Sequence, residues 1–124
     1  MGNFSTFEEI IAWQKARVFN KRIYEITNKD IFKRDFELVK QLRRASISIT
    51  SNISEGFERN TDKEFMYFLY VAKGSSAEIR SQLYLAFDLN YITNNEFEEL
   101  LSNITDISKL ISGLIKYLDK SQKS

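Results

Sequence analysis

The chain has 124 residues, of which 43% are hydrophobic and 28% charged, and its formal net charge is +1. This size suits one soluble globular domain over residues 1–124 and is too small for two. The sequence has no cysteine and no histidine, which excludes disulfides, thiolate or imidazole metal sites and histidine-based hydrolases. We therefore expect no catalytic residue, no metal site and no cofactor.

No apolar run approaches the roughly 20 residues that a membrane span requires. The N-terminal residues lack the basic and apolar segments of a signal peptide. We accordingly expect a cytoplasmic protein with no membrane partner. Proline is absent, so nothing in the sequence forces a helix to stop or to kink.

Helix starts are marked by a threonine followed three residues later by a glutamate, the pattern of a capping box. It occurs at Thr6, Thr61 and Thr93, and the carboxylate of Asp35 can cap a fourth helix. With short connections between the helices, these starts predict an all-α fold, an antiparallel up-down-up-down four-helix bundle. The predicted helices cover residues 7–28, 35–59, 62–90 and 94–119, and the polar tail 120–124 is expected to fray.

The first two predicted helices contain an uneven share of the charge. Between Lys15 and Arg44 lie ten basic and four acidic residues, so this segment carries +6 while the remainder sums to −5. A nearly neutral chain can therefore present a basic face to nucleic acid, although solvated outer helix positions would account for the same charges. The residues expected to contact nucleic acid are Lys15, Arg17, Lys21, Arg22, Lys40, Arg43 and Arg44.

The helix over 35–59 also has a polar stripe beside its apolar one. We expect this stripe to form a structural polar network with the third helix, because buried polar groups need partners. Arg44 could pair with Glu55 or Glu78 instead of binding phosphate. Gly56 indicates either a close helix crossing or an early helix end, and a close crossing would also offset the cost of Gly74. The expected network residues are Gln41, Asn52, Glu55, Arg59 and Glu78.

The third helix, over 62–90, is apolar on more than one side, since Met66, Tyr70 and Tyr84 lie outside its main stripe. Such a helix usually buries more than one side. The fourth helix, over 94–119, keeps helical spacing of its apolar residues almost without error.

Three motifs, taken together, resemble one bacterial family. They are Trp13-Gln14-Lys15-Ala16, the run from Gln41 to Arg59, and Phe65-x-x-Phe68-Leu69-x-x-Ala72-x-Gly74-Ser75-x-x-Glu78. They look like the motifs of four-helix-bundle proteins encoded in intervening sequences of large-subunit ribosomal RNA genes. That family includes the accessory variability determinant (Avd) of diversity-generating retroelements.

The resemblance implies a homo-oligomer, typically a pentameric barrel, with a basic surface that holds RNA or DNA. In the retroelement branch it implies a scaffold for a reverse transcriptase and its template RNA. The function expected from sequence is thus a non-enzymatic nucleic-acid-binding scaffold. The alternative is a protein–protein adaptor that binds a partner enzyme through helix surfaces, with anchor candidates Trp13, Tyr67, Tyr70 and Tyr84. An enzyme is the least favoured hypothesis, and Glu55 with Glu78 is the one carboxylate pair that it would use.

Overall fold

The computed structural model describes residues 4–123, which contain helices and no strand, so the all-α prediction is confirmed. Four of the α-helices are long, and a fifth, α2, is a single turn. None of the helices within 4–123 is long and apolar enough to cross a membrane. The elements are a 3-10 turn η1 (Phe7–Glu9), α1 (Ile11–Thr27), α2 (Asp30–Lys33), α3 (Phe36–Phe57), α4 (Asp62–Asp88) and α5 (Asn94–Lys123).

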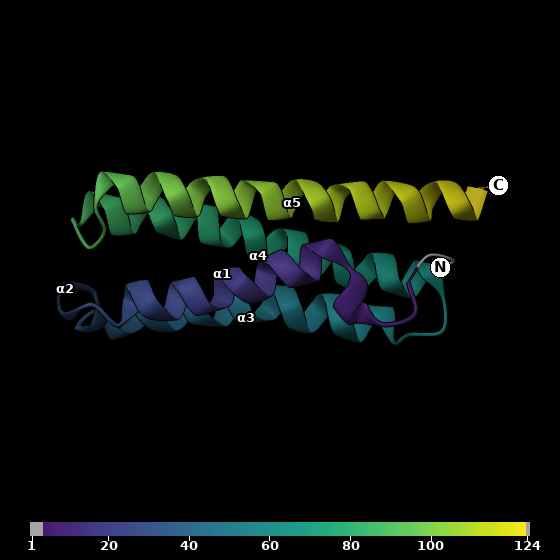
Figure 1. The fold of residues 1–124 in the computed structure, drawn as a ribbon, viewed down its shortest axis with the longest axis horizontal. Coiled ribbons are helices and arrows are strands. Elements are labelled where there is room, and N and C mark those ends of the chain that lie inside the picture. Colours follow the sequence, from purple (N-terminus) through teal and green to yellow (C-terminus); the bar gives the residue numbers. More distant parts are fainter. Residues whose placement is uncertain (1–3, 124) are drawn as a thin grey trace.

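Each long helix packs against two others. Helix α1 contacts α3 and α5, and α4 contacts α3 and α5 on its own two sides. Figure 1 shows that successive long helices run in opposite directions along the molecule. Aliphatic side chains from all four meet in the core, among them Ile23, Ile49, Leu69 and Ile104, each with no exposed surface. Helices α1 and α3 therefore turn a shared outer face to solvent.

Three of the four predicted helix starts contain the expected side-chain cap. At Thr93 the capping box is complete, because the Glu96 amide donates to Thr93 Oγ1 (3.1 Å) and the Thr93 amide donates to Glu96 Oε1 (2.8 Å). Thr61 Oγ1 accepts from the Glu64 amide at 3.1 Å. Asp35 Oδ1 accepts from the amide of Leu38 at 3.1 Å. A short polar side chain at these positions satisfies an amide that the helix leaves unpaired.

The predicted start at Thr6 is wrong. Its side chain caps nothing, and only the short turn η1 follows it. The chain then extends at Ile10 (φ −76°, ψ 119°), whose side chain is buried, and α1 begins one residue later. Placing Ile10 in the core therefore breaks the helix that the pattern of Thr6 and Glu9 predicts.

Two further boundaries differ from the prediction. The segment expected to be a plain connection at 28–34 contains α2, which inserts a fully buried Phe32 against Tyr91, with ring centroids 5.0 Å apart. Helix α5 extends to Lys123, past the predicted end at residue 119, since Leu118 is buried and no glycine or proline follows it. The fraying expected of residues 120–124 stays a prediction. Ser124 lies outside the described residues.

Gly56 lies at a close crossing of α3 and α4. A Cβ built there would lie 2.6 Å from Phe68 Cβ and 2.9 Å from Phe65 Cδ1. Helix α3 also ends one residue later, at Phe57, so both interpretations of this glycine apply. At Gly74 a Cβ would meet nothing within 4 Å, and the close-crossing interpretation is wrong there.

Candidate nucleic-acid interface

The outer surface of α1 and α3 has two adjoining shallow hollows that share Tyr24. Five of the eleven residues that line them are basic and none is acidic. We call this surface the α1–α3 face. Its residues are Arg17, Val18, Asn20, Lys21 and Tyr24 from α1, and Phe36, Val39, Lys40, Arg43, Arg44 and Ile47 from α3.

Helical spacing places these side chains together. Phe36, Lys40, Arg43 and Ile47 follow one another by four, three and four residues, so they lie along one side of α3. The core side of the same helix, which includes Leu42, is buried. On α1, Arg17, Lys21 and Tyr24 repeat the same spacing. The two rows lie side by side because α1 packs against α3.

Arg43 is held in a fixed position on this face. Its Nε donates to Thr27 Oγ1 at 3.0 Å, and the Thr27 hydroxyl in turn donates to the Ile23 carbonyl at 2.6 Å. The guanidinium carbon lies 4.3 Å from the centroid of the Tyr24 ring, which is a cation–π contact. Both side chains are thereby ordered before any ligand arrives.

A second polar link joins the two helices beneath the face. Asn20 Nδ2 donates to Thr50 Oγ1 at 3.1 Å, and the buried Ser46 hydroxyl donates to Asn20 Oδ1. The side-chain amide of Asn20 on α1 thus donates one hydrogen bond to α3 and accepts another from it. This link fixes the register of the two rows of basic residues relative to each other.

Three of the predicted contacts are exposed on this face without an ion pair among the described residues: Arg17, Lys21 and Lys40. Arg17 lies over the ring of Trp13, 5.9 Å from its centroid. Trp13 itself is half-buried and packs edge-on against Phe7, so it is a poor anchor for a partner. These three cations retain their charge for an external anion.

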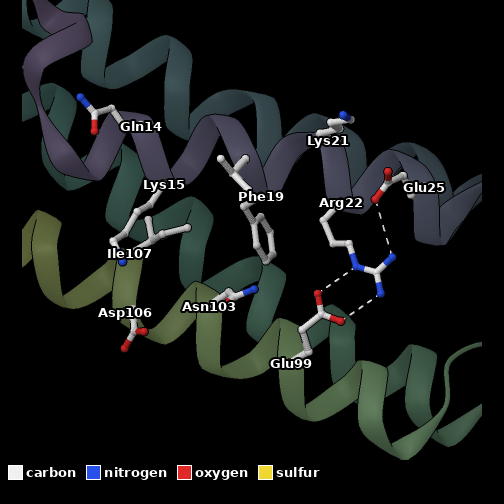
Figure 2. A pocket seen from close by; sticks show the side chains of 11 residues that line it. Gln14, Lys15, Phe19, Lys21, Arg22, Glu25, Glu99, Asn103, Asp106 and Ile107 are labelled. Atoms are coloured by element: carbon white, nitrogen blue, oxygen red, sulfur yellow. Dashed lines mark hydrogen bonds and ion pairs between the residues drawn. The ribbon is translucent and has the colours of Figure 1, made fainter.

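The structure places Lys15 and Arg22 elsewhere, in a groove between α1 and α5. Figure 2 shows Arg22 extending toward α5, where it makes a two-pronged contact with Glu99 (2.8 and 2.9 Å) and approaches Glu25 at 3.6 Å. Lys21 extends away from α5 in the same view. The hydrogen bonds from Arg22 hold the pKa of Glu99 below its usual range, and those bonds raise the pKa of Arg22. Both groups are therefore charged and mutually neutralised.

The groove as a whole has no excess of positive charge. Its basic and acidic lining residues are equal in number, so a polyanion gains little there. The basic residues are Lys15, Lys21 and Arg22, and the acidic residues are Glu25, Glu99 and Asp106. The α1–α3 face, which shares Lys21 with this groove, is therefore the surface where cations are not balanced by lining acids.

Arg44 lies at the border between the α1–α3 face and α4. Its Nη2 lies 4.0 Å from Glu78 Oε2 and donates to Gln41, while Gln82 Nε2 donates to Glu78 at 3.3 Å. The sequence allows Glu55 or Glu78 as the partner of Arg44, and in the structure Glu78 is the one that lies near it. Its charge is therefore partly compensated.

The remaining residues of the expected network fall into two separate groups. Asn52 Nδ2 donates to the Ser48 carbonyl (2.7 Å) and hydroxyl (3.0 Å), and Ser75 donates to the same hydroxyl from α4 at 3.0 Å. Glu55 accepts from Arg59 at 3.4 Å. These contacts lie on the exposed or half-buried margin of α3 and α4, so they are surface links and not one buried network. Glu55 and Glu78 each pair with a different arginine.

Two aromatic residues of the face were missing from the sequence prediction. Phe36 is 81% exposed and Tyr24 is 42% exposed. The available signal was position, because Phe36 falls on the row of Lys40 and Arg43 and not on the apolar row of Leu38 and Leu42. A phenylalanine one residue after a helix cap is easily taken for core.

Comparisons with known proteins agree with the fold. The family model of the 23S rRNA-intervening sequence protein matches residues 8–113. A solved structure from Bacteroides thetaiotaomicron, described as a protein with unknown function from the S23 ribosomal protein family, is 28% identical and superposes with a TM-score of 0.79. The match covers 86% of this chain and 99% of that one. The curated proteins contain no match.

Proposed function

The chain belongs to the 23S rRNA-intervening sequence protein family, and we propose that it is a non-enzymatic, homo-oligomeric scaffold that binds nucleic acid. The observation that carries the proposal is the α1–α3 face, where five cations and no carboxylate line the surface of a chain with a net charge of only +1. Lysine and arginine on such a surface bind phosphates and release condensed counterions. Such binding has no sequence preference of its own, because phosphate contacts carry no base information.

Oligomerisation would multiply the contact between the α1–α3 face and nucleic acid. Helix α4 exposes Tyr67 (64%), Tyr70 (59%), Tyr84 (53%) and Leu85 (48%), which is more apolar surface than a solvated helix needs. We propose that a second copy of the chain covers this surface. The antiparallel four-helix bundle is then the repeating unit of a ring, a pentamer by family resemblance, and a ring repeats the α1–α3 face with a gain in avidity. Size-exclusion chromatography with light scattering measures the subunit number directly.

The binding test compares two variants of equal charge change. Lys21→Glu/Lys40→Glu alters the α1–α3 face, whereas Lys109→Glu/Lys116→Glu alters exposed lysines on α5. Fluorescence anisotropy with a structured RNA and a matched DNA duplex, at about 50 and 200 mM salt, gives the affinities. If five cations contact phosphates of a duplex, affinity falls by a few hundredfold, on the order of 10², between these salt concentrations.

We expect Lys21→Glu/Lys40→Glu to abolish most of the binding and the control pair to change it little. Absence of binding to either nucleic acid at low salt would overturn the proposal. Equal losses in both variants would mean that net charge, and not this face, attracts the ligand.

The adaptor remains the second candidate because of the same aromatic surface on α4. Tyr67, Tyr70 and Tyr84 would then anchor a partner enzyme, a reverse transcriptase in the retroelement branch, instead of a second copy. Such an apolar interface keeps its affinity as salt rises, whereas phosphate binding does not. The proposed cellular location for either function is the cytoplasm.

A further inference from the structure

The most exposed large apolar side chain of the described residues is Phe36, at 81%. It follows the Asp35 cap at the start of α3, where the neighbouring Phe32 fills the core instead. Within the described part of the chain its ring stacks on no other ring and accepts no cation. Burying a phenyl ring is favourable by about 1.5–3 kcal/mol. Because the Phe36 ring is exposed, it does not contribute this free energy to the stability of the fold.

The surroundings of Phe36 combine three kinds of group. Val39 and Ile47 form an apolar floor, Tyr24 presents a second ring, and the cations Lys40, Arg43 and Arg44 line the same hollow. One face of the Tyr24 ring is already covered by the guanidinium of Arg43. No carboxylate lines this hollow. Flat π-surfaces beside phosphate-binding cations are the groups that hold a base and its backbone at the same time.

Building on the proposed function, we propose that the α1–α3 face binds unpaired, single-stranded nucleic acid, with a base stacked on Phe36 and a second at the Tyr24–Arg43 pair. A duplex keeps its bases stacked on each other, so it could offer this face only its phosphates. An unpaired strand exposes the π-faces of its bases, and aromatic side chains stack on them with little dependence on sequence.

The dimensions of the face fit a short strand. Ile47 lies eleven positions after Phe36 along α3, a length of about 16 Å at the rise of an α-helix. At about 3.4 Å per stacked nucleotide this covers roughly five nucleotides. The 2′-hydroxyl plays no part in the stacking, so the proposal concerns the chemistry shared by RNA and DNA.

The test measures affinity for 12-nucleotide single strands of RNA and of DNA, for a duplex of the same length, and for a single strand with abasic sites. Three variants are compared with the wild type: Phe36→Ala, Phe36→Leu, which keeps apolar bulk without a π-face, and Tyr117→Ala, which removes an exposed aromatic of α5. Because both altered side chains are exposed, circular dichroism should show unchanged folding. Fluorescence anisotropy at fixed salt gives each dissociation constant.

We expect Phe36→Ala and Phe36→Leu to weaken binding of the intact single strands by about 5- to 150-fold, the range for loss of one stacked base. Binding of the duplex and of the abasic strand should change less than twofold, and Tyr117→Ala should leave every affinity unchanged. A similar loss in RNA and DNA strands supports stacking, whereas a loss confined to RNA would assign recognition to the ribose and overturn the shared mode.

Different results would refute the stacking mode and the proposed function. Wild-type protein that binds no nucleic acid refutes both. Wild-type protein that binds duplex and single strands alike, with no effect of Phe36→Ala, refutes only the stacking mode. Binding of vesicles containing phosphatidylserine in preference to nucleic acid, lost in Phe36→Ala, would assign the face to a membrane surface and overturn the inference.

Discussion

Replacing Gly56 and Gly74 by alanine, one at a time, isolates the energy of the α3–α4 crossing. Both glycines lie within helices, so each substitution gains about 1 kcal/mol of helix propensity. At Gly74 the new methyl group enters open space, and we expect a stabilisation near that value. At Gly56 it would lie 2.6 Å from Phe68 Cβ, an atom fixed to the α4 backbone that cannot rotate away.

The cost at Gly56 is therefore that of overpacking, about 1–3 kcal/mol, and its upper part is expected because a helix must move. After the propensity gain, Gly56→Ala should be destabilised by about 1–2 kcal/mol. The two variants then differ by about 2–3 kcal/mol, or roughly 8–12 °C in Tm. Urea and thermal unfolding at one fixed protein concentration measure this difference, since association also shifts apparent stability. A Gly56→Ala protein as stable as Gly74→Ala would refute the crossing geometry.

Two other substitutions test local electrostatics and capping. Glu99→Gln should lower stability at pH 7 by less than about 1 kcal/mol, because the partly exposed pair with Arg22 is screened by solvent. The pKa of Glu99 is lowered in the folded state, so its contribution is present above the unfolded pKa and is lost as pH falls through the folded one. Urea unfolding of wild type and variant should accordingly converge as pH falls below the usual range of a glutamate pKa, and a difference that persists in acid contradicts the ion pair. Thr93→Ala should cost about 1 kcal/mol in thermal unfolding. Thr6→Ala should change stability by less than about 0.5 kcal/mol, since Thr6 makes no cap, and equal losses would contradict the assignment.

Local patterns predict the helices well but do not predict where the core requires a break. The box at Thr93 and the cap at Asp35 form as expected, because a cap depends on residues three positions apart. The box at Thr6 fails because Ile10 must enter the core in an extended conformation, a requirement set by packing against distant residues. Helix α2 was missed for the same reason, because it is Phe32 packing against the distant Tyr91 that places this turn in the structure.

The free cations of the site also depend on contacts between residues far apart in the sequence. The excess of basic residues in 15–44 is visible in the sequence, but which of them is neutralised is decided across helices. Arg22 is paired by Glu99, which is 77 residues away, and Arg44 by Glu78 on α4. No spacing rule identifies Glu99 as a partner of Arg22, and for Arg44 the sequence left two partners open, Glu55 and Glu78. Phe36 shows the opposite failure, because its hydrophobicity suggests burial and only its register on α3 indicates exposure.

The division of charge across α1 explains how a nearly neutral chain can present a basic face. Arg22 and Glu25 lie on the side of α1 that faces α5, where Glu99 joins them in a cluster of one cation and two carboxylates. Arg17 and Lys21 lie toward α3, where no acid lines the surface. The pairing on one side binds α1 to α5, and the unpaired charges on the other side remain for a ligand. Because different side chains of α1 make the two surfaces, an anion bound on the α1–α3 face would not compete with the ion pair between Arg22 and Glu99.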